Sequence, residues 1–350
     1  MSKRARLAWF AAVVFVATFG AGELIRWTLE SIPGPGWWAI DFQLVVDAGQ
    51  RLLDGLPLYC DPKFLYPPLA AVAAAPLTLV DPLPASLAYA AVKVGLAAAC
   101  THMLTPGWDR RDRVLAFVGV VGCLPFLHDL FLGNSNTLIV AAMVPAIYGP
   151  SRLRSGVLLG LVAATFAKPL IIPVLIWLLV WRRPAFVGAV ISGLAATALA
   201  VLVVGLGPYA EWLQALAAGA RYAAAFAGNH GVTALAPELF APVAAITALG
   251  LGLVLWRRGP RVGLVWAAAS GMLLAPYAGT YAALPIALAL PAIGPLAPVF
   301  AFVIVAASPI ATTHPLPFYA AAILLGSLAL REPIRHNRSL DTVGLESTRG

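Results

Sequence analysis

Charge is scarce in this sequence. Only 11% of its 350 residues are Asp, Glu, Lys or Arg, and 61% are apolar, whereas ordinary soluble domains carry about 25% charged residues. No soluble fold of this length could bury so much apolar surface, so the composition excludes a soluble enzyme and predicts an integral membrane protein. The apolar segments use up the chain, which leaves room for one membrane domain and no separate soluble one.

Cysteines and familiar catalytic motifs are also scarce. The three cysteines, Cys60, Cys100 and Cys123, give no disulfide framework. No cluster of His, Cys and Asp has the spacing of a metal site, and neither GxxxxGK[ST] nor GxSxG is present, which argues against an ATP-driven pump and a serine hydrolase. The net charge of +8 does not indicate nucleic-acid binding, because the basic residues stand in short clusters between apolar runs.

The apolar runs predict membrane crossings. The first follows basic residues and is expected to remain as a span, because it is too long for a signal peptide. With the N-terminus in the cytoplasm, the inside segments hold 17 of the 23 basic residues and only five of the fifteen acids, an asymmetry that predicts the orientation. The runs lie at about 7–29, 85–104, 114–131, 137–149, 156–168, 169–182, 185–206, 235–255, 262–276, 281–294, 296–308 and 317–330.

These patterns predict an all-α polytopic protein of the plasma membrane with about 12 transmembrane helices. One domain covers residues 1–330, and the polar segment 331–350 is expected to be a disordered cytoplasmic tail. Within the first external loop, 30–84, the apolar stretch Pro67–Val80 is too short for a span, so a re-entrant or juxtamembrane helix on the outer side is expected. Such irregular backbone at membrane depth indicates a protein-walled cavity.

Uncommon polar residues collect on the predicted outer side, which favours a single outward-opening site. Asp41 follows a Trp-bearing apolar entry, where partial desolvation would raise the pKa of its carboxyl and make it a better base. Asp47 would lie on another face of the same helix and is the next candidate. Asp54 and Asp61 are expected to be solvated surface.

Other polar residues keep two interpretations. Lys168 either reaches out to the membrane interface or binds an anionic phosphate. Asn134 and Asn136 either line the site or cap the following helix. His314, between prolines, is expected to be a loop residue.

A set of motifs in a fixed order resembles a known family. Asp41 is followed by AG-x4-DG-x-PLY over 48–59 and by F-x-YPPL over 64–69, and then come Leu132–Asn136, Ala167–Pro169 and Leu274–Tyr277. The set is similar to polyprenyl-phosphate-sugar-dependent glycosyltransferases of the GT-C fold, most of all family 87, which includes mycobacterial α-1,2-mannosyltransferases. Asn134 stands where the family usually has Gln, and Gly279-Thr280-Tyr281 replaces a frequent His or Asp.

The resemblance implies a GT-C-like membrane domain and a metal-independent, inverting transfer on the outer face. The donor would be a polyprenyl-phosphate-linked sugar, most simply mannose, and the acceptor a glycolipid or polysaccharide, with no cofactor and no nucleic acid. Asp41 would be the general base. The family pattern and the outer-side placement suggest substrate-binding roles for Lys168, Arg221, Tyr66, Asn134, Asn136, Asp129, Tyr277 and Tyr281.

Three alternatives remain. Related sequences also use polyprenyl-phosphate-arabinose, so an arabinofuranosyltransferase fits the same residues. A transporter or lipid flippase should carry charges near the midplane and inverted-repeat symmetry, whereas here Lys93 is the main charge within a span. A structural or assembly subunit is the third alternative.

Overall fold

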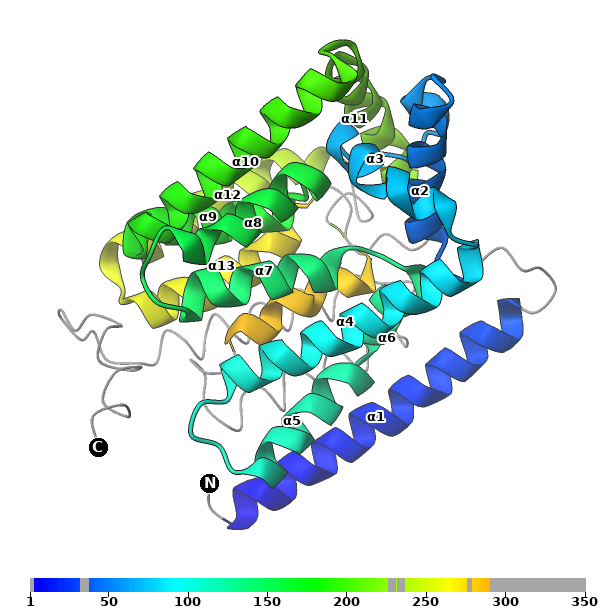
Figure 1. The fold of residues 1–350 in the computed structure, drawn as a ribbon. Helices are drawn as coiled ribbons and strands as arrows, with labels where there is room; N and C mark the ends of the chain where they lie inside the picture. The colour runs from blue at the N-terminus through cyan, green and yellow to red at the C-terminus, as the bar shows by residue number, and fades with distance from the viewer. Residues whose placement is uncertain (1–2, 32–37, 226–230, 232–236, 276–278, 290–350) are drawn as a thin grey trace.

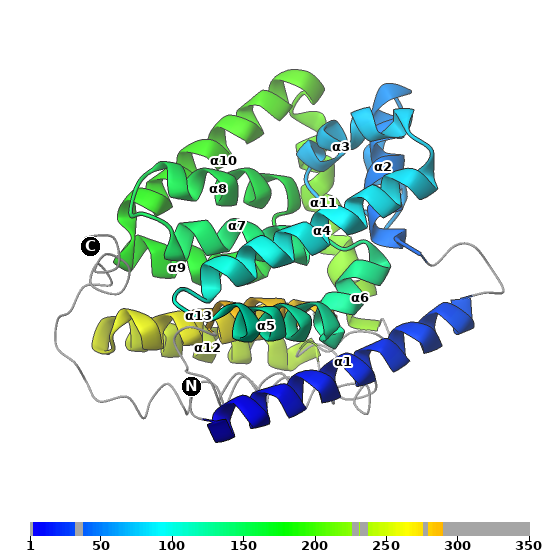
Figure 2. The ribbon, with the colours of Figure 1, turned by 60° about the horizontal axis from the view of Figure 1, so that its bottom comes forward.

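The structure is a computed structural model, and it describes residues 3–31, 38–225, 231, 237–275 and 279–289. Within these ranges the chain forms helices and no strands (Figures 1 and 2). The predicted spans 296–308 and 317–330, the tail 331–350, Tyr277 and His314 lie outside the described residues. The α-helices are α1 (Lys3–Ser31), α2 (Ile40–Leu53), α3 (Pro68–Ala74), α4 (Pro82–Leu104), α5 (Arg110–Gly122), α6 (Leu124–Leu132), α7 (Asn136–Tyr148), α8 (Arg154–Phe166), α9 (Ile172–Trp181), α10 (Arg183–Val204), α11 (Gly207–Ala225), α12 (Phe240–Arg257) and α13 (Pro260–Leu273).

Five 3-10 helices complete the described elements. They are η1 (Leu58–Cys60), η2 (Ala75–Leu79), η3 (Pro169–Ile171), η5 (Pro237–Leu239) and η6 (Thr280–Ala289). The helix formed by α3 and η2 occupies the stretch predicted to be re-entrant or juxtamembrane. It comes after η1 in the chain and packs on α2.

Three of the described helices, α4, α10 and α12, are long and apolar enough to cross a membrane, and the bent pair α5–α6 would be a fourth. The predicted number of about 12 spans therefore stays a prediction. The apolar run 114–131 is not one straight helix, because it bends by 54° between α5 and α6. Pro125 in the first turn of α6 has no N–H to continue the ladder of α5. Helices α7 and α8 have 13 residues each and are about 20 Å long, short for a 30 Å hydrocarbon core.

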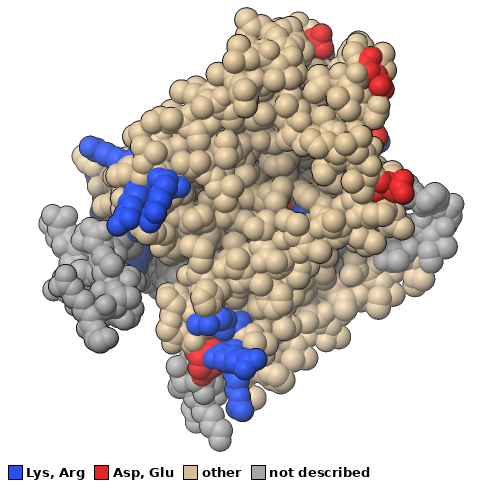
Figure 3. All heavy atoms as spheres, in the orientation of Figure 1, with Lys and Arg blue, Asp and Glu red and all other residues tan. Residues whose placement is uncertain are grey.

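The described arginine clusters share one end of the helix bundle. They stand at the starts of α5 and α8, between α9 and α10, and around the α12–α13 turn, and these turns lie toward the same side in Figure 1. Figure 3 shows Lys and Arg at the lower left, whereas most visible Asp and Glu lie at the opposite upper right. The helices α2, α3 and α11 are at that acidic end. This is the separation of basic and acidic loops that the topology predicts.

The core lies among α7, α8, α9, α10 and α13. Met143, Leu159 and Trp177 are fully buried there, and the Trp177 indole donates a 2.9 Å hydrogen bond to the Pro260 carbonyl. At Gly160 the backbones of α8 and α10 come so close that a Cβ would overlap the Ala189 carbonyl. Small residues allow this close packing of apolar helices, which fixes the end of α8 and hence the position of the residues after it.

Candidate functional site

A cavity of about 110 Å³ lies where α2, α3, α4 and α8 meet the turn between α6 and α7. Figure 3 shows a hollow near the centre of this face, with charged atoms visible at its floor. Its walls are mainly alanine and aromatic side chains, and Asp41 is the one carboxylate among them. The residues lining it are Asp41, Phe42, Val45, Tyr66, Ala70, Ala73, Ala74, Leu77, Tyr89, Gly133, Ser135, Thr165 and Phe166.

The start of α2 is docked on the end of α6, and this contact places Asp41. Ala39, in a left-handed conformation, donates its N–H to the Phe131 carbonyl at 2.8 Å. Gly133 ends α6 with a φ of 69°, and a Cβ there would stand 2.7 Å from the Cβ of Phe42. Only glycine meets both demands without strain. Asp41, in the first turn of α2, is thereby held against the residues that follow Gly133.

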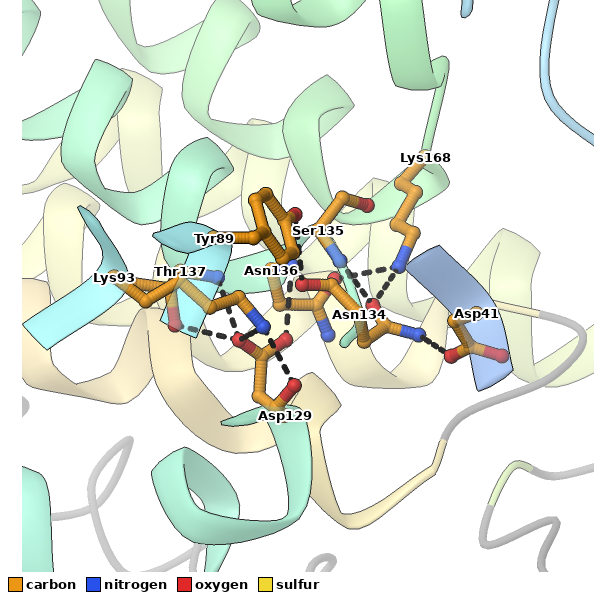
Figure 4. Close-up of polar contacts among 9 residues, drawn as sticks. All are labelled: Asp41, Tyr89, Lys93, Asp129, Asn134, Ser135, Asn136, Thr137 and Lys168. Atoms are coloured by element: carbon orange, nitrogen blue, oxygen red, sulfur yellow. Dashed lines mark hydrogen bonds and ion pairs between the residues drawn. The ribbon is translucent and has the colours of Figure 1, made fainter. Parts of the chain in front are cut away.

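Asn134 joins the carboxylate of α2 to the lysine after α8. Its side-chain Nδ2 donates to Asp41 Oδ2 at 2.5 Å, and its Oδ1 accepts a hydrogen bond from Lys168 Nζ. Lys168 also donates to Asn136 Oδ1 at 2.9 Å (Figure 4). Two amide oxygens thus orient the ammonium group, and no carboxylate of the described residues forms an ion pair with it. An anion would be a favourable further partner for this cation.

Aromatic rings surround this polar group. Lys168 Nζ lies 5.9 Å from the ring centre of Tyr66 and 5.4 Å from that of Tyr281. Tyr89 stacks on Phe42 with ring centres 4.6 Å apart, and its hydroxyl donates to the Asn134 carbonyl at 3.2 Å. The rings limit the access of water, which strengthens the electrostatic interactions within the site.

Burial and neighbouring charges shift the pKa of Asp41, which lines the cavity, and the pKa of Lys168, which is bonded to Asn134. Burial raises the pKa of Asp41, and the Asn134 hydrogen bond and the Lys168 cation offset part of that rise. Burial lowers the pKa of Lys168 to about 8, although the negative charges of Asp129 and Asp41 favour its protonated form. At neutral pH the site therefore combines a carboxylate of increased basicity with a lysine that is still mostly protonated.

A buried ion pair lies behind the site. Lys93 in α4 and Asp129 in α6 are both fully buried, with Nζ and Oδ2 2.8 Å apart. The sequence predicts Asp129 in an outer turn and in contact with substrate. In the structure it belongs to α6, which continues to Leu132, and it does not line the cavity.

The other predicted residues can now be placed. Asp41, Asn134, Asn136, Lys168, Tyr66 and Tyr281 come together in the structure. For Asn134 and Asn136 the capping interpretation is wrong, because the Asp129 carboxylate accepts the first N–H groups of α7. The outward-reaching interpretation of Lys168 is also wrong. Asp54 and Asp61 are exposed as expected.

Two predicted residues have no described side chain. Arg221 belongs to α11, but its side chain lies outside the described part of the structure, as does all of Tyr277. The start of α11 does approach the site, since the Trp212 indole donates to the Leu65 carbonyl at 3.0 Å.

Sequence reasoning missed Tyr89 and Thr137 and gave Lys93 no role in the site. Tyr89 and Lys93 are four residues apart on α4, so both point toward the α6–α7 turn. A lysine within an apolar run was the available signal, since a buried cation in a span needs a partner.

Comparison with known families decides the class of protein. A model of glycosyltransferase family 87 matches residues 64–330, most of the chain. The chain belongs to glycosyltransferase family 87. As a member of that family it is a glycosyltransferase, and its apolar helices make it a membrane protein. Asp41 precedes the matched segment, so its assignment rests on the geometry described above.

One curated protein is similar to part of this family 87 member. The polyprenol-phosphate-mannose-dependent alpha-(1-2)-phosphatidylinositol mannoside mannosyltransferase of Mycolicibacterium smegmatis is 31% identical over 195 residues. The match covers 43% of this chain and 44% of the relative, so the chain spans less than half of the relative's length. No solved structure matches the chain.

Proposed function

We propose that this family 87 glycosyltransferase moves mannose from a polyprenyl-phosphate donor to a hydroxyl of a glycolipid or glycan at the outer face of the plasma membrane. The observation that carries the proposal is the Asp41–Asn134–Lys168 group, in which Asp41 lines the cavity and Asn134 is bonded to both charged side chains. A glycosyl phosphate needs these two groups: a base for the incoming hydroxyl and a cation for the departing phosphate.

Asp41 is the base. The acceptor oxygen forms a bond to the anomeric carbon while the bond from that carbon to the phosphate oxygen breaks, and the hydroxyl proton passes to the Asp41 carboxylate. Attack opposite the leaving group inverts the anomeric carbon. Burial raises the pKa of Asp41, which makes its carboxylate a stronger acceptor for this proton. The Asn134 hydrogen bond holds one carboxylate oxygen in place and leaves the other for the acceptor.

Lys168 receives the phosphate. Negative charge grows on the polyprenyl phosphate as the sugar leaves, and a fixed cation stabilises that charge in the transition state. The ammonium group is already oriented by Asn134 and Asn136, so little reorganisation is needed. A polyprenyl phosphate leaves as a stable anion, and therefore no general acid is required. The first isoprene units of the donor fit the alanine-lined wall that α3 gives the cavity.

The distribution of charge supports the outer-face location. The arginine clusters mark the cytoplasmic end, and the residues of the site stand at the opposite ends of α6, α7 and α8. A lipid-linked donor suits this face, because it carries the activated sugar within the membrane. The cavity is bounded by apolar residues of α3 and η2, and Leu77 on its lining is 37% exposed, which gives the lipid chain a route from the side.

The test is a transfer assay with the full chain in nanodiscs. Polyprenyl-phosphate-[³H]mannose and polyprenyl-phosphate-[¹⁴C]arabinose are offered together with a panel of phosphatidylinositol mannosides and neutral glycolipids. Incorporation of ³H into a glycolipid supports the proposal, and an inverted linkage in the product supports direct displacement. Incorporation of ¹⁴C alone would replace mannose by arabinose. Neither label in any acceptor, together with movement of labelled donor across the bilayer when the protein is reconstituted in sealed vesicles, would favour a flippase.

A further inference from the structure

The Lys93–Asp129 pair is placed where it costs free energy. Lys93 stands in the middle of α4. Its side chain is fully buried, so its charge does not reach solvent. Its Nζ lies 2.8 Å from Asp129 Oδ2 and donates to the Asp129 carbonyl at 2.6 Å. Replacing such a pair by apolar residues is often neutral or stabilising. Fold stability alone is therefore a weak reason for this pair.

The Asp129 side chain organises the first turn of α7. Its Oδ1 accepts the Asn136 N–H at 3.0 Å, and its Oδ2 accepts the Thr137 N–H at 3.3 Å and the Thr137 hydroxyl at 2.6 Å. The Asp129 carbonyl also accepts the Asn134 N–H at 2.9 Å. Both asparagines that hold Lys168 are thus bonded through their backbone to this one aspartate (Figure 4).

We propose that Lys93 and Asp129 are a positioning pair, which fixes the backbone at Asn134 and Asn136 so that their side chains aim Lys168 and Asp41 at the reacting groups. The hydrogen bonds of the two side chains go to each other and to the start of α7, so the pair acts through the asparagines and not on the substrate. The inference rests on the proposed function, because it assumes that Lys168 binds the donor phosphate.

The pair also contributes charge close to Lys168. The titratable side chains around that ammonium group are Asp41 of α2, Lys93 of α4, Asp129 of α6, Tyr66 before α3, Tyr89 of α4 and Tyr281 of η6, and His128 of α6 lies against the Tyr281 ring. Among the charged ones, Asp129 favours the protonated form of Lys168 more than Asp41 does, and Lys93 opposes it. Removal of both members of the pair should therefore lower the pKa of Lys168.

The double variant Lys93→Met/Asp129→Asn separates positioning from stability. It removes both charges, so no buried charge is left alone, and the Asn side chain keeps an oxygen for the N–H groups of α7. We expect the unfolding temperature in detergent to stay within a few degrees of the wild-type value. The kcat for mannose transfer should fall about 100-fold, as it does when reacting groups are slightly misplaced. The alkaline limb of the pH–rate profile should move to lower pH. Wild-type kcat with an unmoved pH profile would overturn the proposal.

A second variant covers the case in which the double variant does not fold. Thr137→Val removes the 2.6 Å hydroxyl bond to Asp129 without changing charge or size, and kcat should fall several-fold while stability changes little. Thr101→Val is the matched control, because the buried Thr101 hydroxyl bonds only its own helix at Ala97. Equal kcat in the two valine variants would also overturn the proposal.

A binding measurement distinguishes failure of this inference from failure of the proposed function. Polyprenyl phosphate without sugar is titrated into the purified protein, and its Kd is read from tryptophan fluorescence. The double variant should bind about tenfold more weakly than the wild type, a ratio typical of a lost interaction with an oriented charge. If the wild type binds this lipid but transfers no sugar, the proposed function fails while the Kd ratio still decides the positioning role. An unchanged Kd together with an unchanged kcat would leave no positioning role.

Discussion

Asn134 donates a 2.5 Å hydrogen bond to Asp41, although 93 residues separate the two in the chain. The bond exists because Gly133 turns the chain in the left-handed conformation at the end of α6 and lets the start of α2 settle on it. One amide side chain then contacts both the proposed base and the proposed phosphate-binding lysine. The distance between base and cation is thereby set by a group that carries no charge of its own.

Asp41→Asn should lower kcat for sugar transfer about 10²- to 10⁴-fold, the usual contribution of a general base. The Asn side chain can still accept the Asn134 hydrogen bond, so the fold should persist, as thermal unfolding in detergent will show. Asp47→Asn is the matched control, since Asp47 lies six residues later on α2 and is exposed. Full activity of the first variant with loss in the second would move the role of base to Asp47.

Deprotonation of Lys168 should give the pH–rate profile of sugar transfer an alkaline limb. Burial lowers the pKa of Lys168 to about 8, so the cation is present below that pH and is lost as the pH rises through it. The rate should therefore fall above about pH 8. Lys168→Arg keeps its charge at every accessible pH and should retain part of the activity with no such limb, whereas Lys168→Met should be nearly inactive throughout. Measuring kcat/KM from pH 6 to pH 10 compares the three proteins, and an identical limb in the arginine variant would assign it to another group.

The same lysine links pH to stability. Because the pKa of Lys168 is lower in the folded protein than the ordinary value of about 10.4, the unfolded chain binds more protons between those values. Stability should rise with pH across that window. Lys168→Met removes this contribution, so the unfolding temperature of the wild type should rise relative to that of the variant from pH 7.5 to pH 10.

Much of the site could be predicted from sequence because polar residues are expensive in this setting. Asp41, Asn134 and Lys168 stand out among apolar runs, and the charge asymmetry predicts that they lie on one side of the membrane. That reasoning needs only the position of each residue relative to the spans. Because this reasoning does not use the packing of the helices, it predicts which residues belong to the group but not how they contact one another.

The internal contacts could not be predicted, for a physical reason. The spans are rich in Ala, Val and Leu on every face, so they lack the amphipathic periodicity that tells which helices touch. The pairing of Lys93 with Asp129 depends on how α4 packs beside α6, and the break between α5 and α6 at Cys123 moves Asp129 from a turn into a helix.

Accessibility of single cysteines tests the orientation. Arg154 starts α8 at the arginine end and Glu211 lies in α11 at the opposite end, and both are exposed. In a background with the exposed Cys60 changed to Ser, Glu211→Cys should react with a membrane-impermeant maleimide on intact cells. Arg154→Cys should react only after permeabilisation. Labelling of both cysteines on intact cells would reject the predicted orientation. Labelling of Arg154→Cys alone would reverse it and place the site on the cytoplasmic side.

Gly133→Ala should disrupt the site by moving α2. A Cβ at residue 133 would lie 2.7 Å from the Cβ of Phe42 and 3.0 Å from the Cα of Ala39, so α2 and with it Asp41 must shift. Gly55→Ala is a sharp control, since Gly55 has a similar φ of 67° but a Cβ there meets no atom within 4 Å. Both variants should lose roughly 1–2 kcal/mol from left-handed backbone strain, and the Gly133 variant should lose more because its Cβ also displaces α2.

Only the variant at Gly133 should also lose transfer, by about 100-fold if the shift approaches 1 Å. The measurement is kcat beside the unfolding midpoint for both proteins, each at a temperature well below its transition. A common loss of stability with a selective loss of kcat would show that the Gly133 turn serves to place Asp41. Equal kcat in the two variants would mean that α2 can leave its contact with α6 without cost to the reaction, and the base would then have to be sought elsewhere.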